Sequence, residues 1–380
     1  MSPPTRPTIA VVGAGMGGLT AAAALRSIGY DAPVFEQAPA FGRLGAGIQL
    51  SANALKAIEP FGVLPALRAI AVTPPSLRNH RAATDELMSE ISFGEDYERT
   101  YGAPYLLLHR GDLHTILSTM VPAETIHLGK RLTDLRRRAD GVDLVFEDGT
   151  TFRAAGVVGA DGIHSRVQEL VFDTAPPRFT GRVAYRTVFS ASLVPAQMSP
   201  TAVKWWGEDR HFVVYTITGG EEIYFVTSVP EEAPAGESWS AKADMDSLRR
   251  AFEGFPEIAQ LVLKACPEAA RWGIYERDPL PRWSDGPVAL LGDACHPMTP
   301  YLAQGAGMAM EDAVVLARCL QNGSPIEAAF RRYEQTRRER ASAVQAMASR
   351  NPVLGGNDMS WIYRYDAWTT TLADPGGIAA

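Results

Sequence analysis

A glycine-rich segment near the N-terminus has the residue types and spacing to bind the phosphates of a dinucleotide. The segment Gly13-Ala14-Gly15-Met16-Gly17-Gly18 has the pattern GxGxxG, and Glu36 ends the next apolar run. In such a loop the first glycine permits a sharp turn, the second admits a pyrophosphate, and the third lets a helix pack closely on a strand. The helix N–H groups then face the phosphates, and a carboxylate at Glu36 suits a ribose. The pattern predicts a dinucleotide site, disfavours NADP at that site, and does not distinguish NAD from FAD.

A second group of side chains could act on an aromatic hydroxyl. His211, Val213 and Tyr215 alternate along one expected strand and therefore project from one face. If Gly219-Gly220 forms a two-residue hairpin turn, Tyr215 lies directly opposite Tyr224. Three polar aromatic residues would then share one face. They would either line a binding site or be ordinary sheet aromatics whose polar groups reach water.

The elements that must position these groups alternate between strand and helix. A strand at 8–12, a helix after the glycine loop and a strand at 31–36 predict a βαβ unit. Further apolar strands at 156–160 and 287–293 are expected to join the same parallel sheet. The other expected elements are a strand leading into a helix at 104–117, a strand meander within 131–158, alternating strands at 178–229, and helices at 244–265, 305–320 and 325–350.

Composition and charge exclude several classes of protein. Of 380 residues, 46% are hydrophobic and 21% charged, which is typical of a globular chain. The formal net charge of −7 disfavours binding to nucleic acid or an anionic membrane. No apolar run approaches the roughly 18 residues that span a bilayer, and the start of the chain does not resemble a cleavable signal. We therefore expect a cytoplasmic protein.

The three cysteines, Cys266, Cys295 and Cys319, are too sparse for a disulfide framework and have no CxxC spacing. We expect buried thiols and no metal site. Cys295 precedes His296, but adjacent residues point apart and rarely share a proton, so a nucleophilic pair is disfavoured.

Three separated motifs together resemble the class A FAD-dependent aromatic monooxygenases, the family of the 4-hydroxybenzoate and salicylate hydroxylases. The first is the glycine loop with Glu36, and the second is Gly159-Ala160-Asp161-Gly162 with Ser165. The third starts with Gly292-Asp293-Ala294-Cys295-His296-Pro297 and continues to Pro300, Gln304, Gly305 and Asp312. The resemblance extends from Ile9 to about Arg340.

This resemblance implies an α/β fold. A Rossmann-like FAD-binding domain with a parallel sheet would comprise residues 1–177, with the meander inserted, and resume at 276–380 with C-terminal helices. An antiparallel β-sheet domain at 178–275, with helices, would bind the substrate.

The resemblance also implies the cofactor contacts. Glu36 would contact the adenosine ribose, Arg43 and Arg110 would lie near the phosphates and flavin, and Asp293 would contact the ribityl chain. The helix start at 305–308 would present N–H groups to the flavin N1/O2 edge and stabilise the reduced flavin. The full set of expected cofactor residues is Gly13, Gly15, Gly18, Glu36, Gln37, Arg43, Arg110, Leu132, Asp161, Asp293, Pro297, Gly305, Ala306, Gly307 and Met308.

Some of these residues have simpler alternatives. Arg43 and Arg110 could form surface salt bridges, and Asp161 and Asp293 could be turn or capping residues. His296 is expected to be structural. Gln168 stands where family members often carry arginine, which leaves open a role of this segment in nicotinamide binding.

Several strings, including KWWGEDRH and GDACHPM, resemble the subfamily of 6-hydroxynicotinate 3-monooxygenases. The resemblance places His211, Tyr215 and Tyr224 around the substrate. Gln49 and Tyr301 stand where this subfamily has histidines, so two groups able to carry positive charge are missing. The substrate could therefore be 6-hydroxynicotinate or another phenol or hydroxypyridine that lacks the carboxylate.

The activity implied is hydroxylation of a small aromatic ring with NADH or NADPH, O2 and a flavin C4a-hydroperoxide, with decarboxylation if the attacked carbon carries a carboxyl group. We expect Tyr215, assisted by His211, to remove the ring hydroxyl proton, which requires a lowered pKa or a relay.

A monomer or homodimer is expected. The alternatives are an NAD-dependent dehydrogenase, a flavin-loaded redox-responsive binding protein, and a flavin epoxidase or halogenase, the last disfavoured because no GWxWxIP string occurs.

Overall fold

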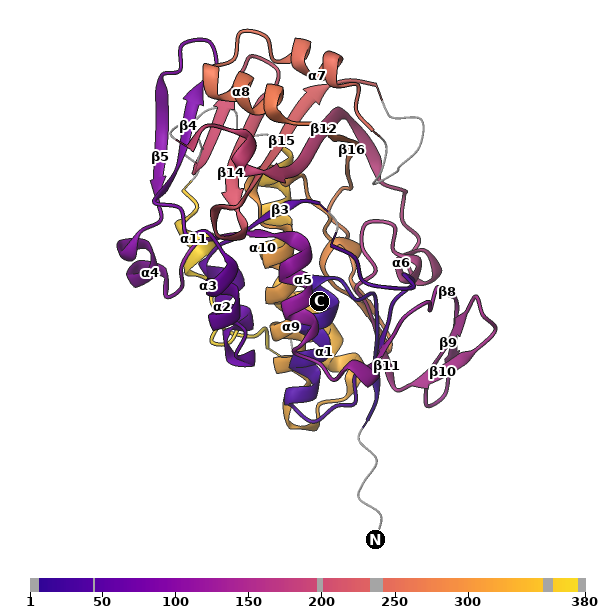
Figure 1. Ribbon diagram of the computed structural model, residues 1–380. Helices are drawn as coiled ribbons and strands as arrows, with labels where there is room; N and C mark the ends of the chain where they lie inside the picture. Colours follow the sequence, from indigo (N-terminus) through magenta and orange to yellow (C-terminus); the bar gives the residue numbers. More distant parts are fainter. Residues whose placement is uncertain (1–6, 44, 197–200, 233–241, 351–357, 375–380) are drawn as a thin grey trace.

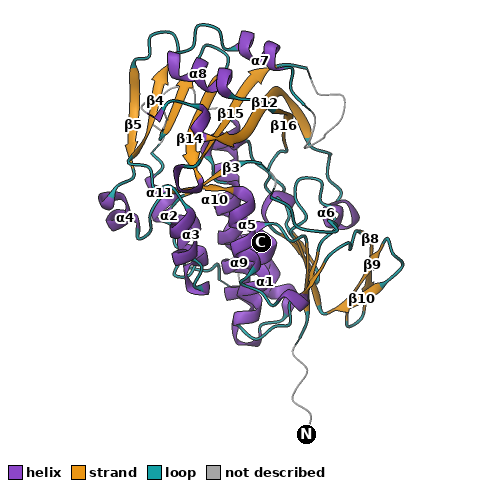
Figure 2. Ribbon diagram, in the orientation of Figure 1, coloured by secondary structure: helices purple, strands orange, loops and turns teal. Residues whose placement is uncertain are grey.

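The computed structural model of the protein describes residues 7–43, 45–196, 201–232, 242–350 and 358–374. In Figure 1 a large twisted sheet lies above a bundle of helices, and a smaller parallel sheet lies beside that bundle. Figure 2 shows that the smaller sheet is followed, at the edge of the molecule, by a separate strand meander. The fold is mixed α/β, as the sequence predicts.

The parallel sheet is assembled from distant parts of the chain. Its order is β17 (Ser284–Asp285), β18 (Val288–Leu290), β11 (Gly156–Gly159), β1 (Ile9–Val12), β2 (Val34–Phe35) and β7 (Ile126–His127). All its pairs are parallel except β17 with β18. β1 is completely buried, as expected for an apolar strand between parallel neighbours. The predicted joining of 156–160 and 287–293 to this sheet is confirmed.

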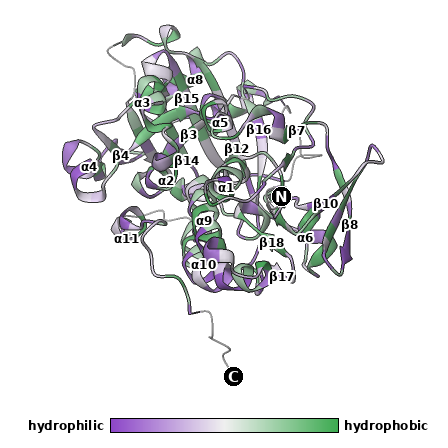
Figure 3. Cartoon of the chain, turned by 90° about the horizontal axis from the view of Figure 1, so that it is seen from below, coloured by the Kyte–Doolittle hydropathy of each residue, from purple (hydrophilic) through white to green (hydrophobic). Residues whose placement is uncertain are grey.

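Helices pack beside this sheet and against one another. α1 (Met16–Ser27) packs against α9 (Gly305–Leu320), which also contacts α2 (Ala52–Ile58) and α10 (Ile326–Ser349). α9 is buried along most of its length, whereas α10 carries both hydrophilic and hydrophobic residues (Figure 3). Further helices are α3 (Leu64–Ile70), α4 (Glu95–Tyr101), α5 (Arg110–Ser118), α6 (Arg166–Val171) and α11 (Ser360–Arg364).

The large sheet has seven strands. Their order is β16 (Ala270–Glu276), β12 (Arg178–Ser190), β15 (Glu222–Pro230), β14 (His211–Ile217), β13 (Ala202–Trp206), β4 (Ser76–Arg81) and β5 (Leu87–Ser92). It is antiparallel except for the pair β13 and β4. The sequence predicted its strands between 178 and 229, but not the addition of β4 and β5 from an earlier part of the chain.

The two faces of the large sheet have different partners. Phe212, Val214 and Phe225 point outward and form a core with α7 (Met245–Ala251) and α8 (Glu257–Ala265). Val213 and Tyr215 point inward and belong to the main core, which also contains the buried residues of β1 and α1. The alternation of one strand therefore decides which residues face the helices below.

The register of β14 and β15 agrees with the sequence prediction. Tyr215 pairs with Tyr224 and His211 with Ser228. The connecting turn is one turn of 3-10 helix at Thr218–Gly220, which preserves the predicted pairing. The three polar aromatic residues therefore share one face.

Two smaller sheets complete the fold. β3 (Gly47–Leu50) pairs with β6 (Leu106–His109) beneath the large sheet, and β8 (Leu132–Arg138), β9 (Gly141–Phe146) and β10 (Thr151–Ala154) form the predicted meander. Within the described residues, no helix is both long and apolar enough to cross a bilayer.

Candidate functional site

The glycine loop between β1 and α1 has the geometry that the sequence predicts. Gly13 has φ +100°, and a Cβ there would lie 2.4 Å from the Ala160 carbonyl oxygen. A Cβ on Gly18 would lie 2.0 Å from the Gly13 carbonyl oxygen, so α1 packs against the loop only because Gly18 has no side chain. Gly15 has no atom within 4 Å of its Cβ position and leaves its backbone open to a ligand.

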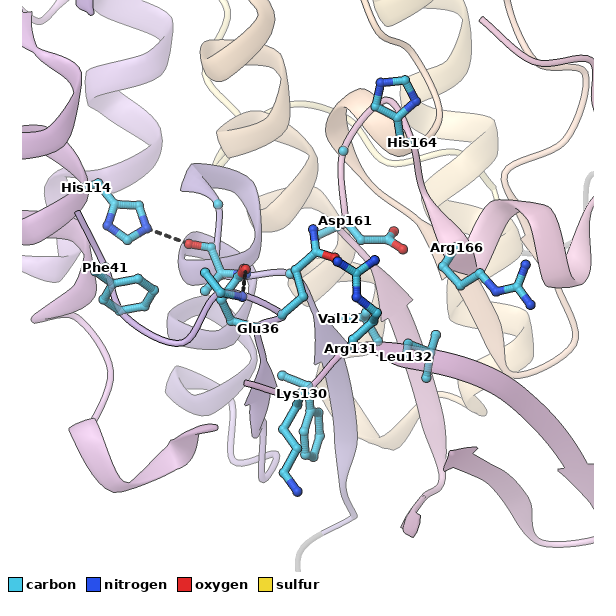
Figure 4. A pocket seen from close by; sticks show the side chains of 18 of the residues that line it. Val12, Glu36, Phe41, His114, Lys130, Arg131, Leu132, Asp161, His164 and Arg166 are labelled. Carbon is cyan, nitrogen blue, oxygen red and sulfur yellow. Dashed lines mark hydrogen bonds between the residues drawn. The ribbon is translucent and has the colours of Figure 1, made fainter. Parts of the chain in front are cut away.

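A cavity of about 620 Å³ opens at this loop. Of the predicted cofactor residues, Gly13, Gly15, Glu36, Gln37, Arg110, Leu132 and Asp161 line it. In Figure 4, His114 and Phe41 lie on one side of Glu36, and Asp161, His164 and Arg166 lie on the other. The sequence did not single out His114, Lys130 or Arg131, which also line the cavity.

Glu36 is held by backbone groups at the cavity edge. Its carboxylate accepts hydrogen bonds from the backbone N–H of Ala14 and of Ala38, each 2.8 Å long. His114, one helical turn after Arg110 in α5, contacts the Ala14 carbonyl oxygen at 2.7 Å (Figure 4). The loop is therefore fixed by residues from two other elements before any ligand binds.

Asp161 both caps the start of α6 and lines the large cavity. Its carboxylate accepts hydrogen bonds from the Ser165 hydroxyl and the Val167 N–H at the start of α6, and it also lines the cavity. Burial raises its pKa. Gln168, at the position where family members often have arginine, is buried and donates to the Ala294 carbonyl oxygen at 3.0 Å. It therefore connects α6 to the segment that leads into α9.

Arg43 lies outside the large cavity. Its guanidinium donates to Asp112 at 2.7 Å and to Glu222 at 2.6 Å, and these bonds raise its pKa. Asp112 is in α5 and Glu222 is in β15, so Arg43 connects the nucleotide-binding part to the large sheet. Arg43 therefore forms salt bridges, which is the simpler alternative that the sequence left open, and does not line the large cavity.

The start of α9 approaches the predicted ribityl contact. Asp293 precedes α9, and its Oδ1 lies 3.7 Å from the Cβ position of Gly305. Surrounding protein raises the pKa of Asp293, although its side chain remains accessible to solvent. Arg110 is enclosed as well, and burial lowers its pKa despite the attraction of Asp293 and Tyr224. Because Asp293 precedes α9 and Tyr224 lies in β15, Arg110 interacts electrostatically with both the start of α9 and the large sheet.

A buried network of charged side chains supports α9 from behind. His296 Nε2 lies 2.5 Å from Asp312, Arg337 donates to Asp312 at 2.8 Å, and Arg337 also pairs with Glu311 at 2.8 Å. Burial would raise the pKa of Asp312, but the neighbouring His296 and Arg337 lower it to about 2. Cys295, His296 and Asp312 lie close enough to suggest metal ligands, but the Asp312 oxygens already bind His296 and Arg337. His296 has the predicted structural role.

The three cysteines are buried and unbridged, as predicted. Burial raises the pKa of each thiol. Neutral buried thiols are poor nucleophiles, which agrees with the interpretation from sequence.

A second cavity, of about 170 Å³, lies against the inner face of the large sheet. His211, Gln49 and Tyr301, all predicted substrate-site residues, line it. The Tyr301 ring packs edge-on against His211 with 5.3 Å between centroids, and its hydroxyl lies 3.0 Å from Ser228 Oγ. Gln49 in β3 accepts a 2.5 Å hydrogen bond from the Tyr105 hydroxyl.

Tyr215 and Tyr224 lie behind this cavity rather than in its wall. A Cβ on Gly47 would lie 2.5 Å from the Tyr224 ring and 2.8 Å from the Tyr215 hydroxyl, so both tyrosines pack tightly against β3. Burial raises the pKa of Tyr215 well above its usual value, and Tyr224 adds to this shift, while hydrogen bonding from Gln49 opposes it. This shift is opposite in sign to the one that a tyrosine base requires.

His211 is held in its neutral form, which can accept a proton or a hydrogen bond. Burial lowers its pKa well below the usual value, and Lys204 and Arg182 contribute to the same shift. The imidazole is therefore neutral at pH 7 and can accept a proton or a hydrogen bond from a ring hydroxyl. Lys204, which also lines the cavity, was not singled out from the sequence. Lys204 stands two residues before Trp206, which pairs with His211. This spacing is the sequence signal from which Lys204 could have been identified.

The large cavity and the α9 start fit a flavin dinucleotide. The open backbone at Gly15 provides the close approach that a pyrophosphate needs, and Glu36 provides a carboxylate at the ribose position of the βαβ unit. Asp293 does not line the large cavity, but its accessible carboxylate beside Gly305 would offer a polar group to a part of the cofactor that extends toward α9.

Comparison with known proteins agrees with this geometry. The family described as "FAD binding domain" matches residues 6–349. A 6-hydroxynicotinate 3-monooxygenase from Pseudomonas fluorescens is 42% identical, with 97% of each chain covered. Among solved structures, HpxO from Klebsiella pneumoniae with FAD and uric acid has a TM-score of 0.81 and 29% identity, and covers 94% of this chain and 92% of that chain. A salicylate hydroxylase substrate complex has a TM-score of 0.82 and 27% identity, with 96% of each chain covered.

Proposed function

Because the chain belongs to the FAD-dependent aromatic-ring monooxygenases, we propose that it uses NADH or NADPH and O2 to hydroxylate a single hydroxylated ring in the 170 Å³ cavity. The observation that carries this proposal is the placement of the cavity. It lies between His211 on the large sheet and the segment 300–303, which leads directly into α9. A cavity of about 150 Å³ is sufficient to bind benzene, so the volume suits one ring.

FAD, when bound, supplies transfer of electrons from the nicotinamide to O2 and the activated oxygen. The residues proposed to hold it line the large cavity or start α9. Glu36 would accept hydrogen bonds from the ribose, and the backbone at Gly15 would face the pyrophosphate. The N–H groups at the start of α9 carry partial positive charge that suits a negatively charged ring edge.

Within the small cavity, His211 is proposed to accept the proton of the ring hydroxyl. A neutral imidazole that faces the cavity meets the geometric and protonation requirements of a general base. Tyr215 is proposed to remain protonated and to hold Gln49, whose side chain lies within hydrogen-bonding reach of its hydroxyl. Removing the proton raises the electron density of the ring carbons at which oxygen is transferred.

The buried aromatic wall of the cavity supports the coupling of oxidation to hydroxylation. Trp206 and His211 are buried lining residues, and so are Tyr363 in α11 and Tyr105, which directly precedes β6. A site that excludes water protects a reactive oxygen donor from decay to H2O2. This arrangement suits a monooxygenase better than a binding protein without turnover.

The substrate is proposed to be a hydroxylated monocyclic aromatic such as 6-hydroxynicotinate. The relative from Pseudomonas fluorescens carries this compound in its name, and a salicylate hydroxylase is among the similar structures. The alternative is a phenol or hydroxypyridine without the carboxylate, because Gln49 and Tyr301 replace two expected histidines.

The proposal is tested with the FAD-loaded protein under ¹⁸O2. NADH or NADPH consumption is measured with hydroxypyridines, hydroxybenzoates and nitrophenols, and the products are analysed by mass spectrometry. A true substrate stimulates consumption and yields a product with one ¹⁸O atom. Consumption that produces only H2O2 with every ring, or no stimulation by any of them, would contradict the proposed function.

A further inference from the structure

Lys204 is a buried cation in the wall of the small cavity. It lies in β13, is 7% exposed, and pairs with Val213 of β14 and Asn79 of β4 on the inner face of the sheet. Its Nζ lies 3.7 Å from the centroid of the Trp206 ring. In the described part of the chain, no carboxylate forms an ion pair with it. The face of the indole is therefore the contact that stabilises its charge.

The two nearby carboxylates of β5 and its preceding turn face the other way. Glu90 pairs with Arg78, whereas Ser89 pairs with Asn79, so Glu90 lies on the face of the sheet opposite to Lys204. Asp85 accepts a hydrogen bond from the Trp205 indole, and Trp205 also belongs to the outer face. The cavity face thus holds a lysine without a protein counter-charge among the described residues.

An ammonium group in this position is costly unless an anion joins it. Burial lowers the pKa of Lys204 to about 7, which shows how strongly its surroundings disfavour the charge. A bound carboxylate would reverse this effect by pairing with the ammonium. Asn79 and Ser89, which also line the cavity, offer neutral hydrogen-bond donors to the same group.

We propose that Lys204 is the anion-binding residue of this cavity and selects substrates whose ring carries a carboxylate. The proposal rests on the proposed function and deepens it. Trp206 lies directly opposite His211, so Lys204 is the diagonal neighbour of His211 on the same face. Diagonal neighbours in a sheet lie about 7–8 Å apart at the backbone, within reach of long and aromatic side chains, so Lys204 and His211 can contact different substituents of one ring.

Lys204 also resolves the alternative left open by the sequence. Gln49 and Tyr301 cannot supply the positive charge of the two histidines that they replace. Lys204 supplies one positive charge to the same cavity from a different strand. The loss of the histidines therefore does not favour a substrate without a carboxylate.

The test compares matched ligands on the FAD-loaded protein and on Lys204→Met. Two pairs are used, 6-hydroxynicotinate with 2-hydroxypyridine and 3-hydroxybenzoate with phenol, and the Kd is measured from the change in flavin absorption. A hydrogen bond to a charged group is worth about 1.5–3 kcal/mol, so the carboxylated ligands should bind about 10- to 100-fold more weakly to the variant. The uncharged ligands should change by less than about threefold.

Two further variants serve as controls. Lys204→Arg keeps the charge and should restore most of the preference for carboxylated ligands. Lys242→Met removes an exposed lysine that pairs with Glu268, and should leave every Kd unchanged. Replacing an unpaired buried ammonium with a methionine of similar length should not lower the melting temperature. A folded Lys204→Met protein with an unaltered carboxylate preference would overturn the proposal.

The pH dependence offers an independent readout. Protonated Lys204 binds the carboxylate, so affinity is complete below pH 7 and decreases as the pH rises through the pKa of the complex. The other titratable groups at the cavity do not mimic this, because His211 stays neutral and burial raises the pKa of Tyr105 and Tyr363. Lys204→Met should lose the pH dependence.

The outcomes separate this proposal from the proposed function. Equal weakening of charged and uncharged ligands would assign Lys204 a structural role and overturn the inference. 4-Nitrophenolate, titrated on the same two proteins, carries its negative charge on the ring oxygen. Selective loss of its binding in Lys204→Met, with the carboxylated ligands unaffected, would place Lys204 at the ring oxygen and also overturn the inference. If carboxylated ligands bind selectively but no aromatic ligand stimulates NAD(P)H oxidation, the role of Lys204 is supported and only the monooxygenase function is contradicted.

Discussion

Replacement of His211 by glutamine should separate proton removal from the rest of the reaction. Glutamine keeps a similar length and a hydrogen-bonding group but cannot take up a proton. General-base assistance contributes about 10²–10⁴-fold to a rate. Because burial, Lys204 and Arg182 lower the pKa of His211, its imidazole is a weak base, and the lower end of this range applies. We expect about a 10²-fold decrease in hydroxylation, equivalent to about 2.7 kcal/mol.

The assay measures three quantities on the FAD-loaded variant under identical conditions. These are the Kd of the aromatic ligand, NAD(P)H consumption, and the hydroxylated product. Since His211 lines the small cavity and not the large one, the flavin spectrum should be unchanged. Consumption should continue with H2O2 as its main product. At saturating ligand, the rate of hydroxylation in the parent enzyme should not decrease between neutral and mildly acidic pH, because burial holds the pKa of His211 well below its usual value.

The reasoning would be refuted by a His211→Gln protein that forms hydroxylated product at the parent rate. A decrease that is matched by loss of flavin would also contradict it, since the variant would then have failed at cofactor binding. Rescue of hydroxylation at high pH, where the substrate ionises without assistance, would support the assignment.

Three other replacements test the remaining parts of the account. Tyr215→Phe should lower hydroxylation by about 2- to 12-fold, since it removes one neutral hydrogen-bonding group worth about 0.5–1.5 kcal/mol, and an effect as large as that of His211→Gln would return the base role to Tyr215. Glu36→Ala should weaken FAD binding by about 10- to 100-fold in a fluorescence titration of the apoprotein, because a charge-assisted bond to the ribose is lost; equal affinity would remove Glu36 from the site. Arg337→Met should lower the free energy of unfolding in urea by about 3–5 kcal/mol, since Glu311 and Asp312 each lose one buried ionic partner, and a change under 1 kcal/mol would contradict this.

Local patterns predicted the parts of the fold whose partners are adjacent in sequence or share a repeated motif. The βαβ unit follows from the order of strand, glycine loop and helix, and the opposition of Tyr215 and Tyr224 follows from the position of one turn. The return of the strand at 156–160 to the first sheet was also predictable, since a parallel apolar strand must be covered on both faces.

Other features depend on contacts that no local pattern contains. β4 and β5 carry polar residues on both faces, and they join the large sheet through β13, which lies far along the chain. The pairing of Arg43 with Glu222 likewise joins distant segments. The environment of Lys204 depends on the same distant pairing, because Asn79 and Ser89 complete its side of the cavity. The alternation of β13 shows only which face Lys204 occupies.

The assignment of Tyr215 as the base shows how burial changes a chemical role. Its position opposite Tyr224 was predictable, but the close packing of both rings against Gly47 was not. That packing excludes water and raises the pKa of Tyr215, so the phenol is better suited to donate than to accept a proton. His211, on the same strand, faces the cavity and has the opposite shift.

The central claim is that one chain binds FAD and an aromatic ring, and that the ring binds close enough to the flavin to alter its absorption. It is tested most directly by the visible absorption spectrum of the purified protein, reconstituted with FAD if needed and titrated with 6-hydroxynicotinate. The account predicts flavin absorption bands that stay with the protein and shift saturably as the ring binds. A protein that neither retains FAD nor takes it up, or whose bound flavin does not respond to any aromatic ligand, would contradict it.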